Sequence, residues 1–169
     1  MHVIIDGYNV IRQSSQLQIL DAMDLQAGRE ALIELLAQYR GRSHHRITVV
    51  FDGWQHGDLK ESRDQHQGIL IIYSRRGERA DEVIKRLLHQ ERERALVVTS
   101  DREIQVCAEH VKASWINVGQ FELSYLHLTG ASDHEGEADP SSTRGTHKKG
   151  PARRLSKRQR QRQQRLKKL

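Results

Sequence analysis

Four aspartates in this 169-residue chain occupy places where a carboxylate can take part in catalysis. Asp6 ends the hydrophobic run HVIID, Asp52 ends TVVFD, and Asp101 follows LVVTS. Asp81 lies in the first turn of a helix predicted after a third hydrophobic run. If these runs are parallel strands, all four carboxylates lie at the edge where strands end and helices begin, which is where open α/β sheets bind ligands.

Carboxylates that converge in this way repel one another, and burial makes the repulsion stronger. A hard divalent cation relieves it, and Mg²⁺ or Mn²⁺ binds through a few carboxylates together with water and substrate phosphate. Such an ion orients a water molecule for attack on a phosphodiester and neutralises charge on the transition-state oxygens. The pattern therefore predicts a metal-dependent nuclease that needs no small-molecule cofactor.

Each acid also has an ordinary structural explanation. Asp followed by Gly is a common turn signal, and it occurs at Asp6 and at Asp52. Asp81 and Asp101 suit the first turn or the N-cap of a helix. The functional interpretation depends on finding all four at the same edge of one sheet.

Polar neighbours accompany the acids. Asn9 suits a turn or a cap, or else holds Asp6 or a water on the metal. Thr99 and Ser100 cap the next helix, or order Asp101, or touch phosphate.

The elements that must position these residues alternate along the chain. Strands are predicted at five mostly continuous hydrophobic runs, as expected for strands covered on both faces: His2–Asp6, Ile47–Asp52, Ile69–Tyr73, Ala95–Thr99 and Ser114–Val118. Helical spacing of apolar residues predicts helices at Leu25–Tyr39, Ala80–Arg92, Asp101–Val111 and Gly119–Leu128. In the first of these, Leu25 belongs to the predicted apolar face and Asp24 is the predicted N-cap. This order predicts an α/β fold with a mainly parallel sheet of about five strands, and leaves Gly53–Gly68 as an irregular link.

Composition divides the chain into a folded part and a basic end. Residues 1–131 hold 16 Lys/Arg and 18 Asp/Glu, residues 132–140 hold four acids, and residues 141–169 hold 12 Lys/Arg and no acid. We expect a folded domain over residues 1–130, a linker over 131–150, and a basic tail over 151–169 that is disordered or helical on binding. A dense run of Lys/Arg binds phosphate backbones by counterion release, which points to a polyanion, nucleic acid first, as the partner.

Several classes of protein are disfavoured. With one cysteine, Cys107, the chain forms no internal disulfide, and no histidine spacing resembles a zinc site. No stretch has the length of a membrane span or the pattern of a signal peptide, so we expect a cytoplasmic protein that does not engage membranes. The oligomeric state is left open.

Four motifs, IDGYNVI, VVFDG, GERADEVI and VVTSDREI, together resemble the YacP-like branch of the NYN domain, within the PIN-like nuclease superfamily. The resemblance covers about residues 1–130. It implies a three-layer fold with a central parallel sheet and the activity of a metal-dependent RNA endonuclease. Some proteins of this family act on mRNA at the ribosome, so the resemblance also implies a possible ribosomal setting. It implies Asp6, Asp81 and Asp101 as the metal-binding acidic triad, with Asn9 and Asp52 in support. Position 79 departs from the pattern, because it holds Arg79 where the family usually has Thr.

Candidate RNA contacts surround these acids. Arg75, Arg76 and Arg79 flank Asp81 and could hold phosphate oxygens on either side of the cut, or else point into solvent. Trp54 could stack on an unpaired base or anchor its loop. Further contacts are expected at Ser100 and in the tail, at Arg153, Arg154, Lys157, Arg158, Arg160, Arg162 and Arg165.

Two other functions compete with the nuclease. The fold could serve as a non-catalytic module that binds RNA (mRNA or rRNA) or the ribosome. A phosphatase is disfavoured, because the expected Asp-x-Asp at the first strand has Tyr8 in its third position. A receiver-like phospho-acceptor domain is disfavoured, because no lysine is placed after the last strands.

Overall fold

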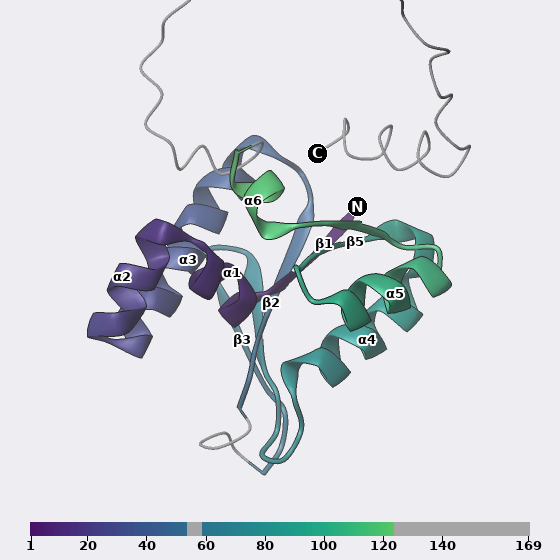
Figure 1. The fold of residues 1–169 in the computed structure, drawn as a ribbon, viewed down its shortest axis with the longest axis horizontal. Coiled ribbons are helices and arrows are strands. Elements are labelled where there is room, and N and C mark those ends of the chain that lie inside the picture. The colour runs from purple at the N-terminus through teal and green to yellow at the C-terminus, as the bar shows by residue number, and fades with distance from the viewer. Residues whose placement is uncertain (54–58, 124–169) are drawn as a thin grey trace, which may run out of the picture. The chain divides into compact units, whose positions relative to one another are not determined.

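A computed structural model of the chain describes residues 1–53 and 59–123, and within them a single six-stranded sheet lies between helices (Figure 1). The strand order is β3-β4-β2-β1-β5-β6. The strands are β1 (His2–Asp6), β2 (Arg46–Phe51), β3 (Ser62–His66), β4 (Ile69–Tyr73), β5 (Ala95–Val98) and β6 (Ser114–Ile116). All are parallel except β3, which confirms the predicted α/β class and the five predicted strands to within two residues at each end.

Strand β3 corrects the prediction of an irregular link at Gly53–Gly68. It pairs antiparallel with β4, from Ser62 opposite Tyr73 to His66 opposite Ile69. Its sequence, SRDQH, is almost wholly exposed at the edge of the sheet, so it carries none of the hydrophobic signal that marks the other strands. Gln67 and Gly68 join the two strands with positive φ at both residues, the conformation of a two-residue hairpin turn.

The helices are α1 (Gly7–Gln13), α2 (Ser15–Met23), α3 (Leu25–Arg42), α4 (Ala80–Glu91), α5 (Arg102–His110) and α6 (Val118–Phe121), with a 3-10 turn at Arg92–Arg94. The structure confirms the predicted α3, α4 and α5, and Asp24 caps α3 by accepting a hydrogen bond from the Gln26 amide. Leu25 is 47% exposed, however, because it is the first residue of α3 and the buried residues of this helix start only at Gly28, so its predicted place on the apolar face is wrong. The predicted Gly119–Leu128 helix is described only as far as residue 123, and α1 and α2 were not predicted.

Helices cover both faces of the sheet. Figure 1 shows α1, α2 and α3 on one side and α4 and α5 on the other. Side chains alternate along each strand, and Ile4, Val50, Ile72 and Val97 form a buried cluster with the apolar residues of α4 and α5. None of the described helices combines the length and apolarity that a membrane crossing requires.

Strand order reverses at β1, in the middle of the sheet. The chain proceeds from β1 to β2 and then to β4 on one side, and it later returns to place β5 and β6 on the other side. The carboxyl ends of β1 and β5 therefore form the crevice where α/β folds of this kind bind ligands. Asp6 is the last residue of β1, and Thr99, Ser100 and Asp101 follow β5.

Gly7 is a helical residue with a packing role, so a turn, the ordinary alternative considered for Asp6–Gly7, does not explain this pair. It opens α1 with its Cα against the buried ring of Phe51, and a Cβ at this position would overlap that ring. The Phe51 ring is itself fixed between Tyr8, at 5.3 Å, and Tyr73, at 5.6 Å between ring centroids. Only glycine allows the helix to start this close to the sheet.

We therefore expect Gly7→Ala to destabilise the fold by about 1–3 kcal/mol through overpacking, despite the better helix propensity of alanine. The matched control is Gly41→Ala in α3, where a Cβ meets nothing within 4 Å and a small gain in stability is expected. Urea unfolding of both variants measures the difference. Equal effects at the two positions would contradict the packing role of Gly7.

Candidate active site

Asp6 lies at the centre of the candidate site and is only 7% exposed. It ends β1 and is the N-cap of α1, with its Oδ1 accepting a hydrogen bond from the Asn9 amide at 3.2 Å. The Thr99 hydroxyl donates to its Oδ2 at 3.5 Å. A buried carboxylate is thus held by two donors, one from its own helix and one from the segment that follows β5.

Asp101 is attached to the same segment. It is the N-cap of α5, and its Oδ1 accepts hydrogen bonds from the amides of Glu103 at 2.7 Å and Ile104 at 3.2 Å. Its own amide donates to the Thr99 hydroxyl oxygen at 3.0 Å. One threonine side chain therefore links Asp6 to Asp101, which agrees with the alternative in which Thr99 orders Asp101.

Asn9 and Ser100 connect the two central strands. The Asn9 Oδ1 accepts from the Ser100 amide at 3.0 Å, so the Asn9 side chain is bonded to the β5 segment, and the Asn9 backbone amide is what holds Asp6. Gln13 completes this network by donating to the Asn9 Oδ1 at 2.8 Å and accepting from the Ser100 hydroxyl at 2.7 Å. The sequence analysis missed Gln13, whose only signal is its place four residues after Asn9 on a helix that was not predicted.

Asp81 and Asp52 complete the set of acids. Asp81 lies in the first turn of α4, as predicted, and Asp52 follows β2; both are half-buried. The charges of Asp81 and Asp101 both act on Asp6, and the charges of Asp101 and Asp52 act on Asp81. The structure therefore brings all four acids into one electrostatically coupled group, although they come from four separate segments.

This coupling adds to the effect of burial on two of the acids. Burial, followed by the neighbouring charges of Asp81 and Asp101, raises the pKa of Asp6 to about 6. Burial and the charge of Asp101 also raise the pKa of Asp81, although Lys85 and Arg79 oppose the shift. Both carboxyls lie where an added cation would favour their ionised forms.

The donor chemistry of the group suits a hard cation. All four side chains offer carboxylate oxygens, the ligands that Mg²⁺ and Mn²⁺ prefer. In residues 1–53 and 59–123, however, no three His, Cys, Asp or Glu side chains are placed to hold one ion together. The arrangement fits an ion held by one or two carboxylates with water and substrate phosphate completing its shell, as is usual for Mg²⁺.

The predicted RNA contacts are placed only in part. Arg75, Arg76 and Arg79 are exposed on the loop that leads into α4, and Arg75 forms an ion pair with Glu78 at 3.5 Å. Ser100 is half-buried beside Asn9. Trp54 and the basic residues of the tail lie outside the described residues, so their roles stay predictions.

A cationic side chain that the sequence pattern did not single out packs against the aromatic residues around Phe51. The Arg29 guanidinium of α3 donates to the Tyr8 hydroxyl and sits 5.3–5.6 Å from the ring centroids of Tyr8, Phe51 and Tyr73. It also lines a groove of about 500 Å³ between α3 and the β3–β4 hairpin. Spacing alone gave no signal for Arg29, because α3 and the two tyrosines lie in separate parts of the sequence.

The chain is similar to proteins of known sequence and structure. A sequence profile of the YacP-like NYN domain matches residues 3–168. The protein YacP of Bacillus subtilis is 33% identical over 85 residues, which are 50% of this chain and 49% of that protein. The chain thus spans about half the length of this curated relative.

Solved structures agree with the fold. The crystal structure of Rae1 (YacP) from Bacillus subtilis superposes with a TM-score of 0.59 at 28% identity, covering 72% of this chain and 71% of that one. A single-substitution variant of the same protein gives a TM-score of 0.57 at 27% identity, with 70% of each chain covered. These matches show the sheet and its helices in a protein with recognisable sequence similarity.

The raised pKa of Asp6 predicts a pH-dependent stability. Because the folded-state pKa of about 6 lies above the unfolded value of 3.8, the protonated carboxyl is favoured in the fold. Its stabilising contribution is fully present below about pH 4 and is lost as the pH rises through about 6. We expect metal-free Asp6→Asn protein to be more stable than the parent at pH 7.5, by about 3 kcal/mol at most, and similar to it at pH 4.

Chemical unfolding in EDTA across this pH range measures the difference. The asparagine Oδ1 can still accept the Asn9 amide, so the helix cap survives the substitution. If the difference in unfolding free energy between the parent and Asp6→Asn does not change with pH, the raised pKa of Asp6 is contradicted.

Proposed function

Because this chain belongs to the YacP-like NYN domain family, we propose that it is a metal-dependent RNA endonuclease that hydrolyses phosphodiester bonds. The PIN-like, nuclease-type fold of the family supports a nuclease or RNA-related role. We propose in addition that the reaction depends on a metal ion and takes place at the ribosome.

The observation that carries the proposal is the coupling of Asp6, Asp81 and Asp101 at the point where strand order reverses. The charges of both other acids act on Asp6 and add to the effect of burial on its pKa, so a cation that binds near Asp6 would lower the repulsion among the three. A fold that only needed helix caps would gain nothing by bringing a buried carboxyl into the field of two others. The strain that this arrangement costs is relieved when a cation binds.

Each residue of the group has a role in this proposal. Asp6 and Asp101 hold Mg²⁺ or Mn²⁺ with help from Asp81, Thr99 fixes the first two relative to each other, and Asn9 holds Asp6 in place. When bound, the ion supplies a polarised water and neutralises charge that develops on the phosphate. Asp52 lies at the next strand end, where it can orient a water or the ion's outer shell.

RNA recognition is proposed to be electrostatic. Arg75, Arg76 and Arg79 stand on the loop beside Asp81, where exposed guanidinium groups can bind phosphates flanking the cut. The 12 Lys/Arg of residues 141–169 give the chain a second, sequence-independent affinity for RNA. We propose that the substrate is mRNA engaged with ribosomes in the cytoplasm. The rRNA of the ribosome carries many closely spaced phosphates, to which the basic tail could bind.

A non-catalytic RNA- or ribosome-binding module is the second candidate. It is favoured by the cap bonds that already engage Asp6 and Asp101, and by the absence, in the described part of the chain, of three ligands placed around one ion. In that case the acids only start helices, and the basic residues alone carry the function.

Cleavage of labelled single-stranded RNA by the full chain in Mn²⁺ separates these candidates. We expect EDTA to abolish cleavage, and Asp6→Asn and Asp101→Asn each to reduce it by about 100-fold or more, because each removes a charge that holds the ion. Binding of the RNA, measured in parallel, is expected to change little.

Asp24→Asn is the matched control, because Asp24 is also a helix N-cap but caps α3 by bonding the Gln26 amide at 3.1 Å. Asparagine caps a helix as well as aspartate does, so this variant is expected to cleave normally. RNA binding without cleavage in Mg²⁺ or Mn²⁺ would overturn the nuclease and leave the binding module.

A further inference from the structure

We propose that Ser74 is a positioning residue for the candidate metal site, where its hydroxyl fixes the segments that carry Asp52 and Asp81 relative to each other. This inference rests on the proposed nuclease function. Ser74 stands outside the four motifs on which the family resemblance rests.

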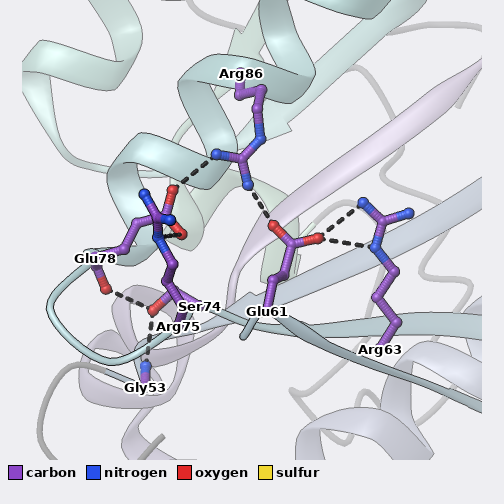
Figure 2. Close-up of polar contacts among 7 residues, drawn as sticks. All are labelled: Gly53, Glu61, Arg63, Ser74, Arg75, Glu78 and Arg86. Atoms are coloured by element: carbon purple, nitrogen blue, oxygen red, sulfur yellow. Dashed lines mark hydrogen bonds and ion pairs between the residues drawn. The ribbon is translucent and has the colours of Figure 1, made fainter. Parts of the chain in front are cut away.

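The Ser74 side chain is 1% exposed and forms two hydrogen bonds (Figure 2). Its Oγ accepts from the Gly53 amide at 2.9 Å and donates to the Glu78 carbonyl at 2.7 Å. Its backbone amide also donates to the Phe51 carbonyl at 3.0 Å, which continues the β2–β4 pairing beyond its last residue pair. One hydroxyl thus satisfies a donor and an acceptor from two different segments.

Those two segments carry two of the four acids. Gly53 directly follows Asp52, and Glu78 lies three residues before Asp81, where the loop turns into α4. Glu78 immediately precedes Arg79, the N-cap of α4, so the hydrogen bond from Ser74 to the Glu78 carbonyl holds the chain directly before the helix starts. A shift of Glu78 would therefore move Asp81 with it.

The Glu78 side chain holds the same loop from its other side. Its carboxylate is buried and bonds the guanidinium of Arg86, on α4, at 2.7 Å, and Arg75 at 3.5 Å. Arg86 also pairs with Glu61, which in turn pairs with Arg63 of β3 (Figure 2). The ion pairs bind the loop to α4 and the hairpin, whereas Ser74 binds it to the segment after β2.

Loss of the Ser74 hydroxyl would affect the positions of the two segments as well as the stability of the fold. Replacing a buried serine by alanine leaves the Gly53 amide and the Glu78 carbonyl without this partner, so the two segments separate or admit water. Movement of residues that support a metal site lowers metal affinity, since removal of a hydrogen-bond partner of a metal ligand typically reduces it by about 10–100-fold.

The test compares Ser74→Ala, Ser74→Thr and Ser14→Ala in the full chain. Ser14 is a matched control, since it is also 1% exposed and its hydroxyl accepts a hydrogen bond, from the Leu17 amide at the start of α2. Mn²⁺ affinity is measured by calorimetry without RNA, RNA cleavage gives kcat and KM, and urea unfolding gives stability.

We expect Ser74→Ala to weaken Mn²⁺ binding by about 10-fold and to lower kcat by a similar factor, while the KM for RNA stays unchanged. Ser74→Thr keeps a hydroxyl and is expected to restore both quantities, and Ser14→Ala is expected to lose stability alone.

Wild-type Mn²⁺ affinity in Ser74→Ala would overturn the inference and leave the proposed nuclease intact. Equal losses in Ser14→Ala, or a loss that Ser74→Thr shares, would assign the effect to stability or packing and would also overturn it. A parent protein that neither binds Mn²⁺ nor cleaves RNA would remove the proposed function, and the inference with it.

Discussion

The confinement of the Asp6 carboxyl at the end of the central strand is the constraint around which the rest of the site is arranged. Strand β1 is buried along its whole length, so its last side chain has little access to water. The fold provides one amide and one hydroxyl as donors, and it brings two further acids close enough to raise the pKa of Asp6. An arrangement that costs folding energy in the absence of a ligand is typical of functional sites.

The capping and catalytic interpretations of the acids are compatible. Asp6 and Asp101 both accept amides at the start of a helix, where the positive end of the helix dipole favours a negative charge. The same hydrogen bonds fix the direction of each carboxylate and partly offset the cost of its burial. A carboxylate that caps a helix at the end of a parallel strand is thus held in a fixed orientation, and the same orientation would suit the metal binding that we propose.

Support for the site comes from the loops as well as the strands. Thr99 and the Asn9–Gln13–Ser100 bonds join the two central strands, while Ser74 and the ion pairs of Glu78 hold the outer segments. The sheet therefore determines which residues reach the edge, and these polar side chains determine how far apart they stay. Gly7 contributes by allowing α1 to begin directly against Phe51.

The sequence by itself determined the parallel strands, helices α3 to α5 and the acids at the strand ends, because continuous hydrophobic runs and helical periodicity are local signals. It did not reveal α1, which is short and begins with glycine, or β3, whose exposed polar residues pair only at the edge of the sheet. Only the tertiary structure shows that β1 lies between β2 and β5. It also shows the hydrogen bonds between Gln13 and Ser100 and between Ser74 and Gly53. Those contacts join residues 21 and 87 positions apart, and their formation depends on strand order, which no local pattern encodes.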